Sequence, residues 1–114
     1  MANSVLITPY FEKKYKRFAK KFTSLDDELL ALESDLKANP KLGESLGANM
    51  YKIRLASKDK GKWKSGGFRV ITYLVQELQN SCAIYLITIF DKSEESTITK
   101  TTLQQLVKTI FETK

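Results

Sequence analysis

Hydrophobic positions recur with a helical period in the first third of the chain and with an extended pattern after it. A short apolar run at residues 5–7 predicts a strand, which Pro9 ends. Aromatic side chains then recur at nearly helical spacing over residues 10–22, and leucines do so over residues 25–36. The pattern therefore predicts one short strand followed by two consecutive helices.

The ends of the second helix carry their own sequence signals. Ser24 followed by Asp27 resembles a capping box, with aspartate in place of the usual glutamate. Asn39-Pro40 is expected to end this helix, because proline disfavours helical backbone at the residue before it. The first helix carries mainly basic residues and the second mainly acidic ones, so the two are expected to attract each other as an antiparallel pair.

Three extended segments and a final helix follow a glycine-containing segment, residues 41–49, which is predicted to be a loop. The extended segments are rich in Ile, Val, Tyr and Leu, are divided by turn residues and predict an antiparallel meander: 50–56, 68–75 and 82–90. Apolar residues at helical spacing predict a helix over residues 101–111. The predicted order is β-α-α-β-β-β-α in a single α+β domain, residues 1–114, with the helical hairpin packed on a small, largely antiparallel twisted sheet.

Side-chain alternation in the stretch YKIRL, residues 51–55, separates apolar from basic positions. The apolar residues point to one face, where they are expected to cover the helices, and Lys52 and Arg54 point to the other. Arg69 lies early in the next strand and is expected to join these two cations across the pairing. Lys92 follows the last strand and is expected to reach the same rim. A solvated sheet face is the competing interpretation of these charges.

The net charge of +6 is concentrated in one segment of the chain. Residues 52–69 hold seven Lys or Arg residues and one acidic residue, so the whole excess lies there. This favours a polyanionic partner, and RNA, DNA and an acidic protein all remain open. The tryptophan of the segment is expected either to stack on a nucleobase or to pin its loop against the domain. The hairpin connection contributes Lys58, Lys60, Lys62, Trp63 and Lys64.

The rare residue types exclude several classes of site. The chain has no histidine and one cysteine, which excludes a paired-imidazole nuclease and metal sites built from His and Cys. Cys82 lies in an apolar run and is expected to be buried and inert. The apolar runs are too short to cross a bilayer, and the N-terminus lacks the pattern of a signal peptide. A cytoplasmic protein without a cofactor is therefore expected.

The motifs YKIRL, KGKWKSGGFRVITY and IYLITIFDKSE, in this order of elements, resemble the RelE/ParE superfamily of bacterial toxins. The resemblance is greatest to HigB-like, RelE-type members, and it covers nearly the whole chain, most specifically residues 50–95. It implies a toxin of a type II toxin–antitoxin system that cleaves mRNA in the ribosomal A site by metal-independent attack of the RNA 2′-hydroxyl. It also implies as partners the ribosome, mRNA and a cognate antitoxin, which in many such systems carries a DNA-binding helix-turn-helix.

The resemblance implies catalytic roles for Lys52, Arg54, Arg69 and Lys92, and RNA or ribosome binding by the basic connection. Arginine forks suit the charge of a pentavalent phosphorus centre, and a lysine is expected to take part in proton transfer. The chain departs from the family near Ile98, where relatives carry a catalytic tyrosine or histidine. The general acid is therefore unassigned, with three candidates: Tyr73, Asp91 and Glu94. A ParE-like gyrase inhibitor and a non-catalytic RNA-binding module remain the alternatives.

Overall fold

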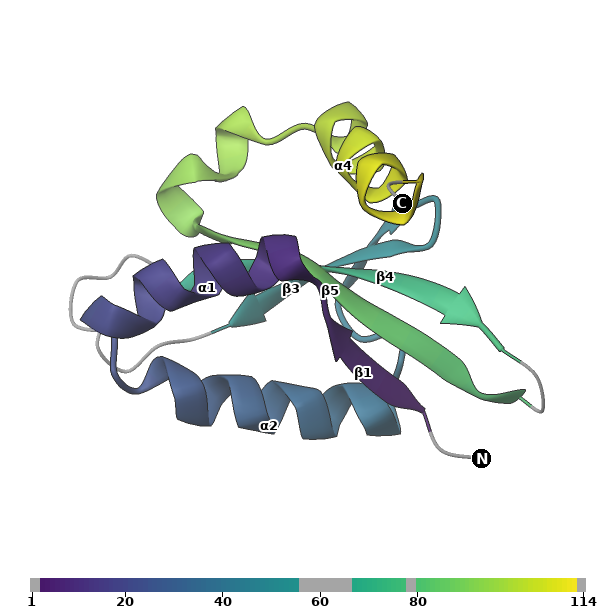
Figure 1. Cartoon of the computed structure of the whole chain (residues 1–114), viewed down its shortest axis with the longest axis horizontal. Coiled ribbons are helices and arrows are strands. Elements are labelled where there is room, and N and C mark those ends of the chain that lie inside the picture. Colours follow the sequence, from purple (N-terminus) through teal and green to yellow (C-terminus); the bar gives the residue numbers. More distant parts are fainter. Residues whose placement is uncertain (1–2, 56–66, 78–79, 113–114) are drawn as a thin grey trace.

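A five-stranded sheet forms the middle layer of the computed structural model, which describes residues 3–55, 67–77 and 80–112 (Figure 1). The strand order is β1-β5-β4-β3-β2. β1 pairs in parallel with β5, and the other pairings are antiparallel, which confirms the largely antiparallel sheet. The strands are β1 (Ser4–Ile7), β2 (Glu44–Gly47), β3 (Met50–Leu55), β4 (Phe68–Gln76) and β5 (Cys82–Asp91).

Helices cover both faces of this sheet (Figure 1). α1 (Pro9–Lys21) and α2 (Leu25–Ala38) form the predicted hairpin on one face. α4 (Lys100–Glu112) packs on the opposite face, and the 3₁₀ helix η2 (Lys92–Thr97) connects β5 to it. No helix among the described residues is long and apolar enough to cross a membrane.

The sheet separates two apolar clusters, because alternate side chains of each strand point to opposite faces. Ile53 and Leu55 of β3 are buried against α1 and α2, as predicted. Met50 of the same strand belongs to the cluster under α4, so Lys52 and Arg54 also lie on the α4 face. Cys82 is buried on the hairpin side, as expected. The parity of YKIRL thus places the cations on the opposite face from the helical hairpin.

A β-bulge in β5 changes which of its side chains face α4. Thr72 pairs with Leu86 and its neighbour Ile71 pairs with Thr88, so Ile87 is an extra residue in β5. The bulge shifts the alternation, and Phe90 consequently faces α4, directly opposite Arg69 of β4. Nothing in the apolar sequence of β5 predicts this bulge.

Two local predictions are wrong. Residues 44–47 of the predicted loop form β2, which is held by backbone pairing to β3, and Leu46 is the partly buried apolar residue in it. The alternating apolar pattern that predicts strands is absent here, so no pattern in the sequence predicts this edge strand. Ser24 does not form the predicted capping box, because its backbone is already helical and its side chain makes no capping hydrogen bond. The other elements begin and end within two residues of their predicted bounds.

Gly43 allows β2 to lie close to β3. Its φ is +102°, and a Cβ at this position would lie 2.5 Å from the carbonyl oxygen of Lys52. We expect Gly43→Ala to lower the free energy of unfolding by about 2–4 kcal/mol, because it adds backbone strain to a clash with backbone. Gly47→Ala is the matched control, since its φ is also positive at +82° but its Cβ would meet the flexible end of Lys100. Equal losses in denaturant unfolding would contradict this account.

Candidate functional site

Two arginines stand directly opposite each other on neighbouring strands. Arg54 of β3 pairs in register with Arg69 of β4, on the face that carries Lys52. Side chains directly opposite in an antiparallel pair are close enough to interact, and like charges there destabilise the sheet. Within the described residues Arg54 forms no ion pair and its side chain is exposed. The strands therefore hold concentrated positive charge at a position where packing alone would not favour it.

Arg69 is the most deeply buried of these cations. The residue is 4% exposed, and its Nη1 donates a hydrogen bond to the carbonyl oxygen of Phe68 at 3.3 Å. Its Nε donates to Oε1 of Glu95 at 3.2 Å. A buried guanidinium needs such charge-assisted hydrogen bonds, because removing it from water is otherwise costly. Burial and these contacts fix the direction of its planar fork.

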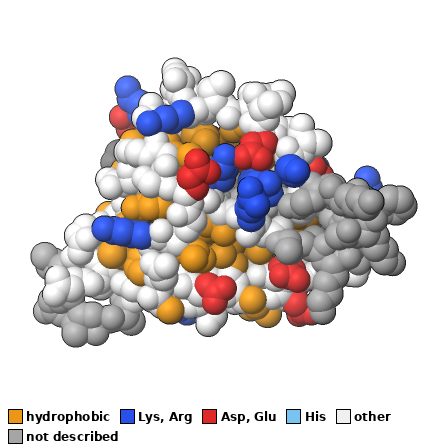
Figure 2. Space-filling view, turned by 180° about the vertical axis from the view of Figure 1, so that it is seen from behind, with side chains coloured by type: hydrophobic (Ala, Val, Ile, Leu, Met, Phe, Trp, Pro, Cys, Tyr) orange, Lys and Arg blue, Asp and Glu red, His pale blue; other side chains and the backbone are white. Residues whose placement is uncertain are grey.

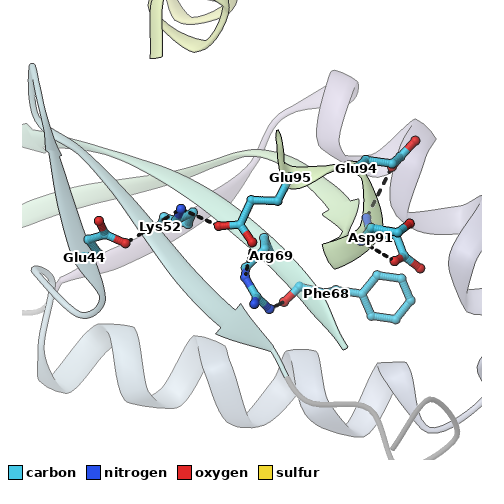
Figure 3. Close-up of polar contacts among 8 residues, drawn as sticks. Glu44, Lys52, Phe68, Arg69, Asp91, Glu94 and Glu95 are labelled. Atoms are coloured by element: carbon cyan, nitrogen blue, oxygen red, sulfur yellow. Dashed lines mark hydrogen bonds and ion pairs between the residues drawn. The ribbon is translucent and has the colours of Figure 1, made fainter. Parts of the chain in front are cut away.

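Glu95 of η2 bridges Lys52 and Arg69 (Figure 3). Its Oε2 accepts a hydrogen bond from Lys52 Nζ at 2.5 Å, while Oε1 accepts from Arg69. Lys52 also lies 3.7 Å from a carboxylate oxygen of Glu44 on β2. The hydrogen bond from Lys52 lowers the pKa of Glu95, and the charges of Lys52 and Arg69 add to this effect against the opposing effect of burial. Glu95 is therefore an ionised carboxylate held between two cations.

These side chains surround a hollow of about 320 Å³, which we call the cationic hollow. On the side opposite the view of Figure 1, Lys and Arg side chains gather with acidic side chains near the centre of the surface (Figure 2). An oxyanion entering the cationic hollow would meet two arginines and a lysine, and it would compete with the carboxylate of Glu95 for them. The residues that line it are Gly43, Glu44, Lys52, Arg54, Arg69 and Glu95.

Hydrogen bonds at the start of η2 hold this short helix in place. Asp91 accepts from the backbone N–H of Ser93 at 2.8 Å, and Glu94 accepts from the backbone N–H of Asp91 at 3.3 Å. Together they form a capping box. The backbone N–H of Lys92 donates to the carbonyl oxygen of Gly67 at 3.2 Å, which ties η2 to the start of β4. These contacts position Glu95 over the sheet.

The structure brings together three of the four predicted catalytic residues. Lys52, Arg54 and Arg69 line the cationic hollow, whereas Lys92 is exposed on η2 and is not among the described residues that line it. The candidates for a general acid do not line it either: Asp91 and Glu94 cap η2, and Tyr73 packs against Phe111 under α4. The predicted RNA-binding residues lie outside the described residues: Lys58, Lys60, Lys62, Trp63 and Lys64.

Sequence reasoning missed Glu95, Glu44 and Gly43. Glu95 is one of two adjacent glutamates in the IFDKSEES stretch, and only the turn of η2 decides which of them faces the sheet. Glu44 and Gly43 lie in the segment that the sequence predicts to be a loop, so neither was expected beside the cations of β3 and β4. The one available signal was indirect, since a cluster of cations inside a folded domain requires acidic partners somewhere in the chain.

Comparisons with known proteins agree with this arrangement of elements. The family model described as "RelE toxin of RelE / RelB toxin-antitoxin system" matches residues 9–113, which include every residue of the cationic hollow. Among solved structures, the chain is similar to an E. coli RelE toxin with two arginines replaced by alanine, in the free state. The TM-score is 0.60 with 17% sequence identity, over 96% of this chain and 99% of that chain. At this identity the structural likeness concerns the fold alone.

Proposed function

Because the chain belongs to the RelE family of toxins from toxin–antitoxin systems, we propose that it is an endoribonuclease that cleaves mRNA in the ribosomal A site and so stops translation. One observation carries the proposal: Arg54 and Arg69 are paired across β3 and β4 beside Lys52, and a carboxylate already bridges two of these cations. A carboxylate and a phosphate are bound by the same charge-assisted hydrogen bonds.

The geometry suits a reaction in which charge develops on a phosphorus centre. When the scissile phosphate enters the cationic hollow and displaces the Glu95 carboxylate, Arg69 and Arg54, which both line the hollow, hold its non-bridging oxygens. The RNA 2′-hydroxyl gives up its proton to solvent water as its oxygen attacks phosphorus, the bond to the 5′-oxygen breaks, and the products are a 2′,3′-cyclic phosphate and a 5′-hydroxyl. Lys52 donates a proton to the departing 5′-oxygen. The ribosome positions the mRNA for in-line attack, which supplies a large part of the rate.

The remaining cations fit a role in attracting the ribosome and mRNA. Lys92 is exposed on η2 beside the site, and in this proposal it contributes to the positive field rather than to the chemistry. The lysines of residues 58–64 and Trp63 are proposed to contact RNA, as the sequence predicts. Action on ribosomes also assigns the toxin to the cytoplasm.

Membership of the family implies an antitoxin as partner. We propose that the antitoxin silences the toxin by keeping mRNA away from the cationic hollow. Acidic residues presented to Arg54 would achieve this, because Arg54 is the exposed cation at the hollow's edge.

A reconstituted translation system tests the proposed activity. We expect the purified protein to cut mRNA within the A-site codon of programmed ribosomes and to leave the same mRNA intact without ribosomes, since ribosomal positioning is part of the mechanism. Primer extension maps the cut. Failure to cut with ribosomes, combined with inhibition of DNA gyrase in a supercoiling assay, would replace the proposal with a ParE-like function. RNA binding with neither activity would leave only a binding module.

A further inference from the structure

A groove between α2 and the end of β3 continues the cationic hollow toward the helical hairpin. It has a volume of about 360 Å³, and it shares Gly43 and Arg54 with the cationic hollow. Figure 2 shows hydrophobic side chains below the gathered Lys and Arg side chains, with acidic side chains below them. We call this feature the acidic groove, because Glu28 and Asp35 of α2 line it.

The floor of the acidic groove is apolar. Leu32 of α2 and Ile53 and Leu55 of β3 line it and are buried. Ala31 lines the groove from α2 and is exposed, so a small side chain leaves the floor open on the side of the helix. A floor of this kind gains free energy when the apolar part of another side chain covers it.

Charges of opposite sign stand on the two walls of the groove. Glu28 and Asp35 lie on the same side of α2, about two turns apart. Arg54 lies on the opposite wall, which β3 forms. Among the described residues, none of these three has an ion-pair partner. The two carboxylates repel RNA phosphates, so the groove fits a polypeptide that carries both a basic and an acidic residue.

The end of β3 also offers backbone groups to a partner. β2 pairs with β3 only as far as Lys52, whereas β4 pairs with β3 as far as Leu55. In the part of the chain that the structure describes, residues 53–55 therefore have no strand on their outer edge. An edge of this kind accepts an extended segment of another chain by backbone hydrogen bonding.

We propose that the acidic groove holds an extended segment of the antitoxin. A basic side chain of this segment reaches Glu28 and Asp35, and an acidic one reaches Arg54. The inference rests on the proposed function, whose antitoxin keeps mRNA away from the cationic hollow, and it names the segment that anchors it. Because the groove and the hollow share Gly43 and Arg54, a segment in the groove is held at the edge of the hollow. Backbone pairing with residues 53–55 fixes its direction.

Titration with synthetic peptides, followed by the NMR shifts of backbone amides at low ionic strength, tests the groove. The probes are peptides of about ten residues in which Val alternates with Ser, with one Asp and one Arg an even number of positions apart, so that both lie on one face of an extended chain. We expect the amides of Ala31 and Leu55 to shift. Replacing Arg of the peptide by Glu should weaken binding about fivefold or more, because an attraction becomes a repulsion.

Reversing one charge of the rim should abolish this preference. Asp35→Arg puts a cation beside Glu28, and we expect it to equalise the affinities for the Arg-carrying and the Glu-carrying peptide. Asp27→Arg is the matched control, because Asp27 is exposed on the same helix and does not line the groove. The control should keep the preference of the wild-type protein.

Filling the groove should separate the antitoxin from the nuclease activity. We expect Ala31→Trp to lose peptide binding and to keep ribosome-dependent mRNA cleavage, since Ala31 does not line the cationic hollow. Protection of mRNA from this variant should need about tenfold more antitoxin. Ala38→Trp, at an exposed alanine of the same helix outside the groove, should behave as the wild-type protein does.

The outcomes separate this inference from the proposed function. Peptide binding that Asp35→Arg and Ala31→Trp change as expected, with impaired protection by the antitoxin, supports the inference. It is overturned if no peptide shifts the groove amides, or if a short RNA or a higher concentration of the free protein shifts them instead. Normal protection against Ala31→Trp assigns the groove to another protein and also overturns it. Absence of cleavage by the wild-type protein defeats the proposed function, while the peptide titration still reports on the groove.

Discussion

Arg69→Ala is expected to lower the rate of ribosome-dependent mRNA cleavage by about 10²–10³-fold, the range found when one preorganised donor to a developing oxyanion is removed. Arg69 is buried, and its direction is fixed by hydrogen bonds to Glu95 and to the Phe68 carbonyl. It therefore needs little reorganisation when charge develops on the phosphorus centre. Single-turnover cleavage on programmed ribosomes, under saturating enzyme, measures the effect.

The chain offers a matched control for the loss of one arginine. Arg17 is exposed on α1, on the other face of the sheet, so Arg17→Ala changes the net charge equally without touching the cationic hollow. Circular dichroism and thermal melting confirm that the variants fold. Arg69→Lys keeps the charge but loses the planar fork, and it should remain strongly impaired. Equal rates for Arg69→Ala and Arg17→Ala would remove Arg69 from the mechanism.

Glu95→Gln is expected to change phosphate binding and stability in opposite directions. Phosphate has to displace the carboxylate of Glu95 from Lys52 and Arg69, and a hydrogen bond to a charged group is worth about 1.5–3 kcal/mol, the lower end of which corresponds to about tenfold. We therefore expect inorganic phosphate to bind about tenfold more tightly to Glu95→Gln. The variant should also unfold more easily, because the repulsion among the three cations is then less compensated.

Glu77→Gln is the control for this pair of effects, since it removes the same charge near the far end of β4. Phosphate titration and denaturant unfolding measure both quantities. Unchanged phosphate binding by Glu95→Gln would mean that Glu95 is not the group that phosphate displaces. Unchanged stability would mean that its carboxylate does not offset the repulsion among the three cations.

The pH dependence of this stability difference follows from the lowered pKa of Glu95. The contribution of the ionised carboxylate is complete above its unfolded value of 4.5, and it is lost as the pH falls through the lower folded value. The advantage of the wild-type protein over Glu95→Gln should therefore be constant above that pH and shrink in more acidic solution. Unfolding curves of the two proteins across this range provide the measurement.

Much of the fold could be predicted from local patterns. The leucines of α2 and the alternation in β3 identify elements whose apolar faces must be buried. The spacing of these apolar residues therefore distinguishes helix from strand. The edge strand β2 could not be predicted this way, because it is held by backbone pairing and carries no apolar alternation. The site was predictable for Lys52 and Arg54, where parity within one strand suffices. Lys92 could not be placed in this way, because the turn of η2 decides that Glu95 faces the sheet while Lys92 is exposed.

The sequence by itself determined that seven cations are concentrated in residues 52–69 and that two of them share a face of one strand. Only the tertiary structure decided the rest. Strand register set Arg54 against Arg69, and the turn of η2 brought Glu95 between Lys52 and Arg69, which lie 43 and 26 residues before it in the chain. The bulge in β5 placed Phe90 beside them. Periodicity is a property of neighbouring residues, whereas the partner of a charge is fixed by register between distant segments, which no local pattern contains.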